Sequence, residues 1–273
     1  MTQANDSVER HSRALWEAAR TGTAIGPLTT SEPGLTITDA YSIQLANVER
    51  ALGQGRRIVG HKVGLTSKAM QEMLGVDEPD FGVLLDDMVV DDGAVIPLGR
   101  LMQPRVEAEI GFRLGRELSG PGATTADALG AIDSAVASLE VIDSRIADWK
   151  IRLVDTVADN GSSAMAVLGS TFTPIGGLDL RLVGVIVERN GVVVEHGVGA
   201  AALGHPAGCV AWLANKLVEF GQTLHAGQIV LPGALHRAIP VAPGDIVRAE
   251  FAVLGAVSVR FAEDDVAEVE EQR

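Results

Sequence analysis

Residues 1–55 carry their apolar side chains at helical spacing. The segment Asp6–Glu9 resembles a capping box, which predicts that a first helix begins there, and Gly22 is placed to end it. Thr38 is predicted to cap a second helix, with Gly53 just past its end. The apolar residues of this second helix recur at i, i+4, i+7 and i+11 and are Tyr41, Leu45, Val48 and Leu52. The pattern predicts a helical N-terminal region over residues 1–55.

From residue 56 onward, short apolar runs are separated by Gly, Asp and Pro, which is typical of β-strands joined by turns. At the centre of the segment 185–194, Asn190 and Gly191 can supply the two positive φ angles of a type I′ hairpin turn. Other strands are predicted over residues 57–63, 88–90, 105–112, 228–231, 246–251 and 256–261. This part of the chain is therefore expected to be rich in β-structure.

Two helices are predicted to interrupt the strands, one from Thr125 and one over residues 206–220. Helical spacing relates Leu129, Ile132, Val136 and Leu139 in the first, and Val210, Leu213 and Leu217 in the second. Because helices do not alternate regularly with strands, the fold class is predicted to be α+β. We expect a β-rich domain over residues 56–262 and, from the acids that end the chain, an unstructured tail over residues 263–273.

Composition narrows the possible partners. Of the 273 residues, 47% are hydrophobic and 21% are charged, which is ordinary for a soluble globular chain. The formal net charge of -14 argues against nucleic acid, because phosphates are bound through clusters of Lys and Arg. No apolar run approaches the ~18 residues of a membrane span, and the N-terminus lacks the pattern of a signal peptide. We therefore expect no membrane partner and a cytoplasmic location.

Several other signals are interpreted as structural. Cys209 is the only cysteine, so no intramolecular disulfide is possible, and its apolar setting indicates a packed helix position. The segment 120–122 suggests a dinucleotide loop, but Thr125 stands where the third glycine belongs. His205, before a proline, is expected to support a helix start. His61 is expected to face away from its neighbour in an alternating strand.

The strongest chemical signal is the pair Glu107 and Glu109, which alternate along the predicted strand 105–112. Side chains at i and i+2 of a strand share one face, so both carboxylates can bind one cation. A half-solvated strand gives the same pattern, and by spacing alone that interpretation is favoured. Glu140 lies at the end of the predicted apolar helix, where a carboxylate needs either a ligand or a base such as Arg145. Three carboxylates suit Mg²⁺ or Mn²⁺ better than Zn²⁺.

Five ordered segments resemble the 2-keto-4-pentenoate hydratase / 4-oxalocrotonate decarboxylase family of the fumarylacetoacetate hydrolase-like superfamily. These segments are residues 60–67, 78–82, 103–109, 139–145 and 155–160. The resemblance runs from about residue 35 to residue 261. It implies a mixed β-roll with a helical N-terminal region, homo-oligomers, and metal ligation by Glu107, Glu109 and Glu140.

The resemblance also implies a lyase of the meta-cleavage pathways that degrade aromatic rings or steroids. A hydratase would add water to C4 of a 2-hydroxy-2,4-dienoate after its ketonisation and yield a 4-hydroxy-2-oxo acid. The cation would stabilise the charge that develops on the C2 oxygen. The segments 78–82, 148–151 and 155–159 favour the hydratase, while 118–122 and 141–145 also occur in decarboxylase-like chains.

Lys62 and Asp80 are the candidates for proton transfer. Burial in an apolar strand would lower the pKa of Lys62, whereas the alternative interpretation is a surface lysine. Asp80 is predicted on a loop, where turn formation is the alternative to a role as base. The candidate substrate contacts combine hydroxyl, amide and backbone N–H groups and are Leu65, Thr66, Ser67, Asn160, Ser162 and Ser163.

Two alternatives come from other classes of protein. A hydrolase that cleaves a C–C bond of a diketone would use the same superfamily metal site, but it needs a His-carboxylate pair that is not evident beside the acidic motif. A non-catalytic subunit that associates with a neighbouring pathway enzyme would also retain the fold. Turnover of a dienoate separates the hydratase from this subunit.

Overall fold

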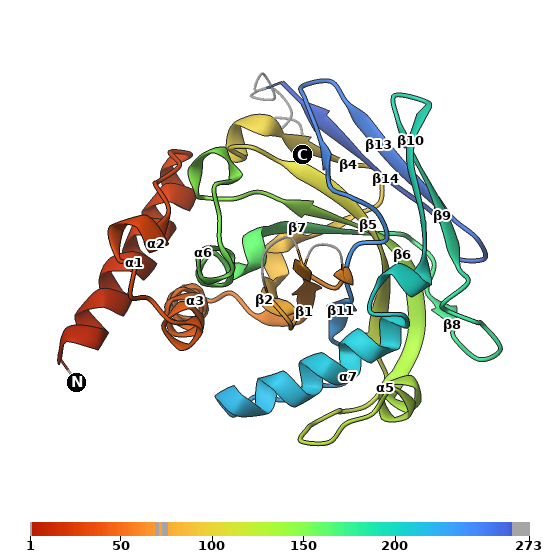
Figure 1. Cartoon of the computed structure of the whole chain (residues 1–273). Coiled ribbons are helices and arrows are strands. Elements are labelled where there is room, and N and C mark those ends of the chain that lie inside the picture. Colours follow the sequence, from red (N-terminus) through yellow and green to blue (C-terminus); the bar gives the residue numbers. More distant parts are fainter. Residues whose placement is uncertain (1, 69–70, 73–75, 264–273) are drawn as a thin grey trace.

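The computed structural model describes residues 2–68, 71–72 and 76–263 (Figure 1). Its α-helices are α1 (Thr2–Thr21), α2 (Leu28–Ser31), α3 (Ile37–Gly53), α5 (Thr125–Ala131), α6 (Leu153–Ala158) and α7 (Pro206–Leu217). Its strands are β1 (Ile58–Gly64), β2 (Asp80–Leu85), β3 (Val89–Asp91), β4 (Ala94–Pro97), β5 (Arg105–Leu114), β6 (Ile132–Ile142), β7 (Ser163–Leu168), β8 (Thr173–Pro174), β9 (Gly184–Arg189), β10 (Val192–Val198), β11 (Ile229–Leu231), β12 (Ile239–Pro240), β13 (Ile246–Phe251) and β14 (Gly255–Ala262). The tail predicted over residues 263–273 lies outside the described residues except for Glu263.

The described strands form two sheets. The larger has nine strands and the order β2-β1-β11-β5-β6-β7-β3, with β12 added to β5 and β8 added to β6. The smaller has the order β10-β9-β13-β14-β4. Both sheets contain parallel and antiparallel pairs, as the predicted mixed β-roll requires. The mixture of helices with two sheets confirms the α+β prediction.

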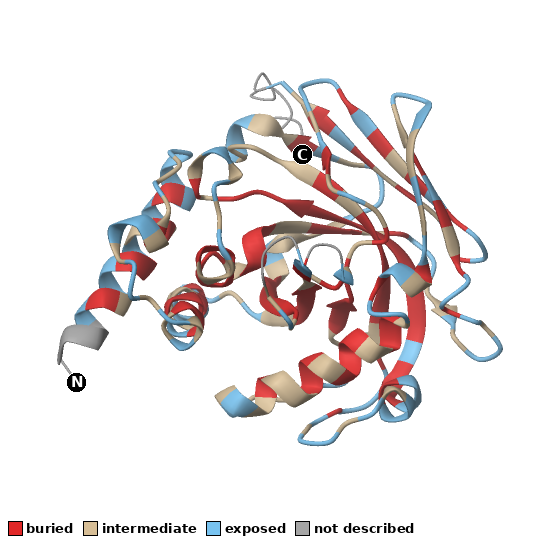
Figure 2. Cartoon of the chain, viewed as in Figure 1, coloured by how far each residue is buried: buried red, intermediate tan, exposed pale blue. Residues whose placement is uncertain are grey.

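The long strands β5 and β6 occupy the middle of the molecule (Figure 1). In that view the smaller sheet lies on the right, α1 and α3 lie on the left, and α7 runs below. Buried residues concentrate on β5, β6 and β7 and on one side of α7 (Figure 2). Most side chains on β5 and β6 are therefore removed from water on both faces of the sheet, which affects the chemistry of the carboxylates there.

The N-terminal helices are present, but both begin earlier than predicted. Helix α1 starts at Thr2 because neither Gly nor Pro stands upstream of the predicted cap at Asp6. Helix α3 is capped by Thr36, not Thr38: the Thr36 hydroxyl accepts from the Asp39 N–H, and the Asp39 carboxylate accepts from the Thr36 N–H. The predicted end of the first helix is confirmed, since Gly22 follows α1 with a φ of 67°.

The long helix predicted from Thr125 is wrong in its second half. Helix α5 ends at Ala131, and the chain continues as strand β6, in which every residue except Asp133 is buried. A strand buried on both faces loses the alternation of polar and apolar residues. Its apolar run then contains residues at helical spacing by chance, and Glu140 lies inside a strand.

The hairpin and the last predicted helix are confirmed. Strands β9 and β10 pair in antiparallel fashion around Asn190 and Gly191, whose φ angles are 55° and 77°. Helix α7 begins at Pro206, and a 3₁₀ turn over Val218–Phe220 extends it to the predicted end. Cys209 is buried in this helix, as its apolar setting predicted.

Gly60 provides a test of how closely β1 packs against β11. A Cβ added at Gly60 would lie 2.1 Å from the carbonyl oxygen of Ile229, so Gly60→Ala must separate the two strands. We expect a loss of about 1–3 kcal/mol in the free energy of unfolding, measured with urea. The control Gly53→Ala has open space at the end of α3 and is expected to cause no loss. Equal midpoints for both variants would contradict the close contact.

Candidate metal centre and active site

Three glutamates meet on one face of the larger sheet. Glu107 and Glu109 alternate along β5, and Glu140 stands directly opposite Glu107 in the antiparallel pairing with β6. One carboxylate oxygen from each lies within 4.8 Å of the others. Two neighbouring strands thus bring together the ligand set that the sequence predicted. The partner of the acidic pair comes from cross-strand register, not from a helix.

Burial overturns the interpretation of a half-solvated strand. Glu109 and Glu140 are 1% and 0% exposed, and Glu107 is half-buried. Burial and the charge of Glu140 raise the pKa of Glu107 to about 7 and raise the pKa of Glu109 well above its usual value. Both oxygens of Glu140 are buried and accept no hydrogen bond from the described residues. Such a concentration of carboxylates fits a divalent cation, whose charge would offset the cost of ionising them.

The chain also fixes the orientation of Glu109. The N–H of Gly233 donates to Glu109 Oε2 at 2.7 Å, and the Ser138 hydroxyl donates to the Glu109 carbonyl at 2.8 Å. One contact comes from the segment after β11 and the other from β6. Glu109 is therefore held from both sides before any ligand binds.

Lys62 projects from β1 towards the same carboxylates and is 4% exposed, which excludes a surface lysine. Its Nζ donates to the Gly161 carbonyl at 3.0 Å and lies 3.6 Å from Glu140 Oε2. The prediction that its pKa is lowered is wrong. Burial acts in that direction, but the charges of Glu140 and Asp80 outweigh it and raise the pKa of Lys62. Lys62 is therefore an ammonium at neutral pH in this environment.

Asp80 is the first residue of β2, not a loop residue, and it pairs with Gly64 of β1. A Cβ at Gly64 would lie 2.1 Å from Asp80 Oδ1 and 3.1 Å from Lys62 Nζ, so the two groups share the space that glycine leaves. Burial raises the pKa of Asp80, and the charge of Lys62 opposes this shift. The two proton-transfer candidates therefore lie next to each other.

Glycines make room for Lys62, and the sequence analysis missed them. A Cβ at Gly82 would lie 3.1 Å from Lys62 Cγ, and a Cβ at Gly161 would lie 3.1 Å from Lys62 Cδ. Together with Gly64, these two glycines leave the space that the aliphatic part of the Lys62 side chain occupies. Gly60 and Gly64 flank Lys62 at i±2, and glycine on one face of a strand is a signal of close approach that could have identified this side of β1.

The segment 159–163, which follows α6 and contains the Gly161 carbonyl, is held in place by Arg145. The Arg145 guanidinium pairs with Asp159 and donates to the Ser163 carbonyl at 3.1 Å. Arg145 is therefore the partner of Asp159 and not of Glu140. Three consecutive residues of this segment have left-handed φ angles, namely Asn160, Gly161 and Ser162. Such a conformation persists only where its surroundings impose it.

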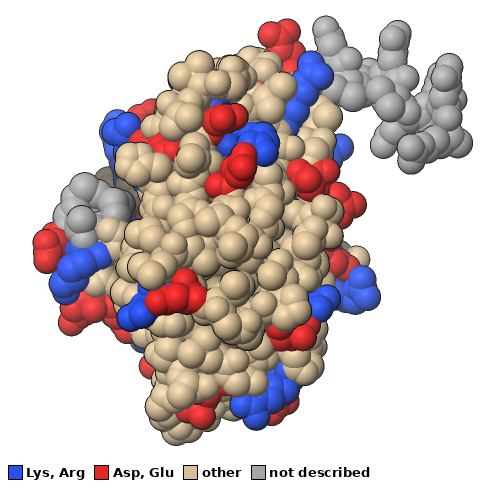
Figure 3. All heavy atoms as spheres, turned by 90° about the vertical axis from the view of Figure 1, so that its right-hand side faces the viewer, with Lys and Arg blue, Asp and Glu red and all other residues tan. Residues whose placement is uncertain are grey.

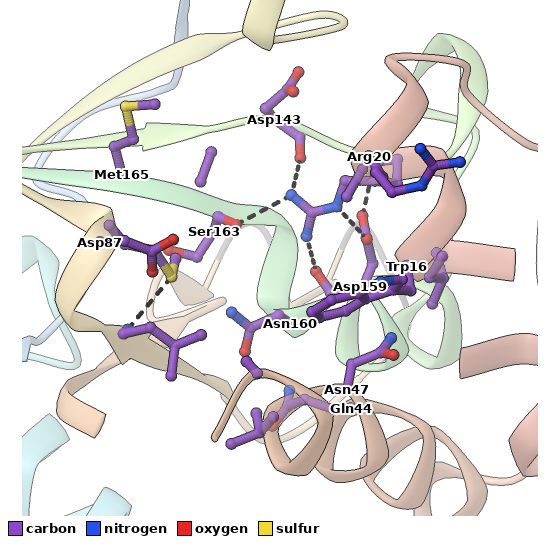
Figure 4. Close-up of a pocket in the computed structure, with 18 of the residues that line it drawn as sticks. Trp16, Arg20, Gln44, Asn47, Asp87, Asp143, Asp159, Asn160, Ser163 and Met165 are labelled. Carbon is purple, nitrogen blue, oxygen red and sulfur yellow. Dashed lines mark hydrogen bonds and ion pairs between the residues drawn. The ribbon is translucent and has the colours of Figure 1, made fainter. Parts of the chain in front are cut away.

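A cavity of about 510 Å³ borders this segment and lies between the N-terminal helices and β7 (Figure 4). Asp159, Asn160 and Ser163 line it together with Trp16 of α1 and Gln44 of α3. The three glutamates are not among its lining residues. The segment 159–163 thus contacts both this cavity and Lys62.

The predicted substrate contacts have different surroundings. The Asn160 amide both accepts from the Val83 N–H at 2.8 Å and donates to the Val83 carbonyl at 2.9 Å, so it holds β2 and is not free for a ligand. The Ser162 hydroxyl lies 3.3 Å from that of Thr156. The buried Ser163 hydroxyl has no hydrogen-bond partner among the described residues.

The segment after β1 lies near the other side of the glutamate cluster. Leu65 has a φ of 55°, and its carbonyl accepts from the Gln71 amide. Thr66 is buried against Gly233, where an added Cβ would lie 2.0 Å from the threonine Oγ1. Because Gly233 donates to Glu109, Thr66 is adjacent to the cluster, while Ser67 follows it and is partly exposed.

Of the two histidines interpreted as structural, His205 has hydrogen-bonded surroundings, whereas both ring nitrogens of His61 are buried without a hydrogen-bond partner among the described residues. His205 Nδ1 accepts from the Ala207 N–H at 3.1 Å and caps α7. His61 is 2% exposed and meets the edge of Phe81, with the ring centroids 6.4 Å apart. Burial lowers the pKa of His61 to about 4, so the ring is neutral.

Comparison with known proteins now defines the class. Residues 50–262 match the family model described as fumarylacetoacetate (FAA) hydrolase C-terminal. The chain therefore belongs to the fumarylacetoacetate hydrolase family, as the resemblance implied. The described helices include none that is both long and apolar enough to span a bilayer.

Its relatives include two hydratases and a structurally characterised decarboxylase. The chain is 48% identical over 253 residues to the 2-keto-4-pentenoate hydratase of Paraburkholderia xenovorans (strain LB400), covering 93% of this chain and 94% of that protein. It is 42% identical to the 2-hydroxyhexa-2,4-dienoate hydratase of Comamonas testosteroni, covering 94% and 98%. The 4-oxalocrotonate decarboxylase from Pseudomonas putida G7, complexed with magnesium and adipate, superposes with a TM-score of 0.92 at 40% identity, covering 94% and 98%.

Proposed function

We propose that this protein is a metal-dependent hydratase that adds water to a 2-hydroxy-2,4-dienoate and forms a 4-hydroxy-2-oxo acid. The observation that carries the proposal is the cluster of buried Glu109 and Glu140 with half-buried Glu107, beside Lys62 and Asp80. The named hydratase relatives, which span nearly the whole chain, support this reaction and a role in meta-cleavage catabolism.

In this proposal the three glutamates hold Mg²⁺ or Mn²⁺. When bound, the cation would supply positive charge for the carboxylate and the C2 oxygen of the substrate. The relative crystallised with magnesium supports such a site. The buried oxygens of Glu140, which accept no hydrogen bond from the described residues, are the best-placed ligands of this chain.

Lys62 and Asp80 divide the proton transfers between them. The Lys62 ammonium, held by the Gly161 carbonyl, donates a proton to the far end of the diene while the C2 hydroxyl gives up its proton in ketonisation. Asp80 Oδ1, which lacks a hydrogen-bond partner among the described residues, takes a proton from the water that adds at C4. After water has added at C4, C3 takes up one proton, which replaces the proton lost from the C2 hydroxyl. The adjacency of the two groups allows the proton to return to Lys62 between turnovers.

The hydroxyls of Thr66 and Ser163 are the substrate contacts that we retain from the predicted set. The Ser163 hydroxyl is buried and lies close enough to Glu140 to lower the pKa of that carboxylate, so it is placed to bind a substrate oxygen beside the glutamates. Thr66 is adjacent to Glu109 through Gly233. Leu65, Ser67 and Ser162 would act by shaping the two segments.

A decarboxylase is the second candidate because the 4-oxalocrotonate decarboxylase superposes over almost the whole chain. Purified protein with Mg²⁺ is expected to remove the ultraviolet absorbance of 2-hydroxypenta-2,4-dienoate without releasing carbon dioxide. The same protein should release none from 4-oxalocrotonate. Carbon dioxide from 4-oxalocrotonate without turnover of the dienoate would replace the hydratase with the decarboxylase. Turnover of neither substrate would exclude both lyases and leave the diketone hydrolase and the non-catalytic subunit, which hydrolysis of a diketone would separate.

We further propose that the protein is a cytoplasmic homo-oligomer. An uncharged area covers much of the side formed by the smaller sheet, with charged residues scattered around it (Figure 3). Ile186, Val193 and Ile246 are 51%, 56% and 47% exposed on that sheet. Such a surface supports self-association. A monomer measured by light scattering at micromolar concentration would contradict the homo-oligomer. Association with a neighbouring pathway enzyme is a separate question, which co-purification tests.

A further inference from the structure

Strand β5 lacks a continuous neighbour on one side at the level of the glutamates. Strand β11 pairs with its C-terminal half through Val230 and Phe112, and β12 pairs with its start through Ile239 and Val106. Between these pairings, residues 232–238 leave strand geometry. Ala108, which separates the two glutamates of β5, lies opposite this connecting segment.

The connecting segment satisfies the backbone of Ala108 in an unusual way. The Leu235 N–H donates to the Ala108 carbonyl at 3.0 Å, as a strand residue would. The Ala108 N–H donates not to a carbonyl but to the ring Nε2 of His236, at 2.9 Å. An imidazole nitrogen thus takes the place of the missing strand carbonyl. The same segment supplies the Gly233 N–H that donates to Glu109.

The partners of the ring fix its protonation. A backbone N–H can only donate, so Nε2 must carry a lone pair. Nδ1 lies 2.7 Å from the Arg237 carbonyl, which can only accept, so Nδ1 must carry the proton. Burial lowers the pKa of His236, which agrees with a neutral ring. Both nitrogens are therefore engaged by the backbone, and the ring is not a free base for water.

The far side of the segment is also fixed. Gly197 of β10 leaves space for the Leu235 carbonyl, since a Cβ there would lie 2.1 Å from that oxygen. Arg237 pairs with Glu195 of the same strand. The segment is held between β10 and β5, and a loss of the contact on the β5 side would let it move away from Glu109.

We propose that His236 is a positioning residue of the metal centre, which holds the connecting segment against Ala108 so that the Gly233 N–H stays directed at the Glu109 carboxylate. This inference rests on the proposed role of Glu109 as a metal ligand. Outer contacts of this kind orient a ligand and commonly change metal affinity about 10–100-fold when removed.

The first test is a measurement on the unmodified protein. With ¹⁵N-labelled histidine at neutral pH and without metal, His236 is expected to be neutral, with the proton on Nδ1 and a bare Nε2. The exposed His225, whose ring pairs with Glu117 and with no backbone group of the described residues, serves as an internal reference. A proton on Nε2, or a charged ring, would overturn the proposal whatever the protein binds.

The second test compares a substitution that keeps a hydrogen-bond acceptor with one that removes it. His236→Gln can retain an acceptor near the position of Nε2, whereas His236→Phe keeps a planar ring and removes the acceptor. We expect His236→Phe to weaken Mn²⁺ binding in calorimetry at least about tenfold and His236→Gln to restore most of this loss. His225→Phe is the matched control and should bind as the unmodified protein does. Equal Mn²⁺ affinities for the Phe and Gln variants would overturn the positioning role.

The two proposals fail in different ways. If the unmodified protein binds no Mn²⁺, the metal centre itself is wrong, while the tautomer of His236 still reports whether its bond to Ala108 exists. If Mn²⁺ binds and the two variants do not differ, the centre stands and the inference about His236 falls.

Discussion

Glu140→Gln is expected to abolish metal-dependent turnover and to weaken Mn²⁺ binding by at least about a hundredfold, since changes in outer contacts alone cost about 10–100-fold. The substitution keeps the size of the side chain but removes one of three anions that converge within 4.8 Å. The amide offers a single neutral oxygen and brings two N–H donors that repel a cation. Calorimetric titration with Mn²⁺ measures the affinity directly.

The stability of the same variant carries a second signature. In the metal-free protein, burial and repulsion by the Glu140 carboxylate both raise the pKa of Glu107. Removing one charge is therefore expected to leave the metal-free melting temperature unchanged or higher. Saturating Mn²⁺ should raise the melting temperature of the unmodified protein, because a ligand at 100 times its Kd contributes about 2.7 kcal/mol, and the same Mn²⁺ concentration should raise that of the variant much less.

An exposed glutamate provides the control. Glu117 is 64% exposed on its side chain and pairs only with His225 among the described residues, so Glu117→Gln should behave as the unmodified protein in both measurements. If Glu140→Gln bound Mn²⁺ with unchanged affinity, Glu140 would not be a ligand. A variant that lost stability without metal would instead indicate that Glu140 serves mainly as the partner of Lys62.

The local sequence pattern was sufficient to place Glu107 and Glu109 together, but it was not sufficient to place Glu140 beside them. Alternation places Glu107 and Glu109 on one face of any strand, so their proximity follows from the sequence. Glu140 reaches them through the pairing of β6 with β5, and register between distant strands leaves no local trace. The family resemblance, rather than periodicity, identified it, since periodicity put it on a helix.

The protonation of Lys62 shows the same limit in electrostatic form. From its apolar strand one expects desolvation to dominate and the pKa to fall. The structure surrounds the ammonium with Glu140, Asp80 and Glu107, which come from three other strands, and the balance reverses. Similarly, His236 gives no sequence signal of its link to Ala108, because that link depends on how the segment 232–238 departs from strand geometry.

Lys62→Met is expected to have the opposite effect on metal from Glu140→Gln. Methionine keeps an unbranched stem that fits among Gly64, Gly82 and Gly161 but removes the ammonium. We expect kcat at saturating metal to fall by about 10²–10⁴, the range attributed to a general acid. Mn²⁺ should bind as tightly or more tightly, because a positive charge 3.6 Å from Glu140 no longer competes with the cation.

The comparison of kcat with metal affinity separates a proton donor from a structural lysine. Lys150→Met, at a side chain that is 71% exposed, is the matched control and should change neither quantity. Turnover retained in Lys62→Met at full metal occupancy would remove Lys62 from the proton-transfer step. Weaker Mn²⁺ binding with an unchanged kcat would mean that the ammonium merely orders the carboxylates. A loss of kcat with undiminished Mn²⁺ binding leaves one interpretation. The Lys62 ammonium, although it repels the bound cation, is required because it donates the proton.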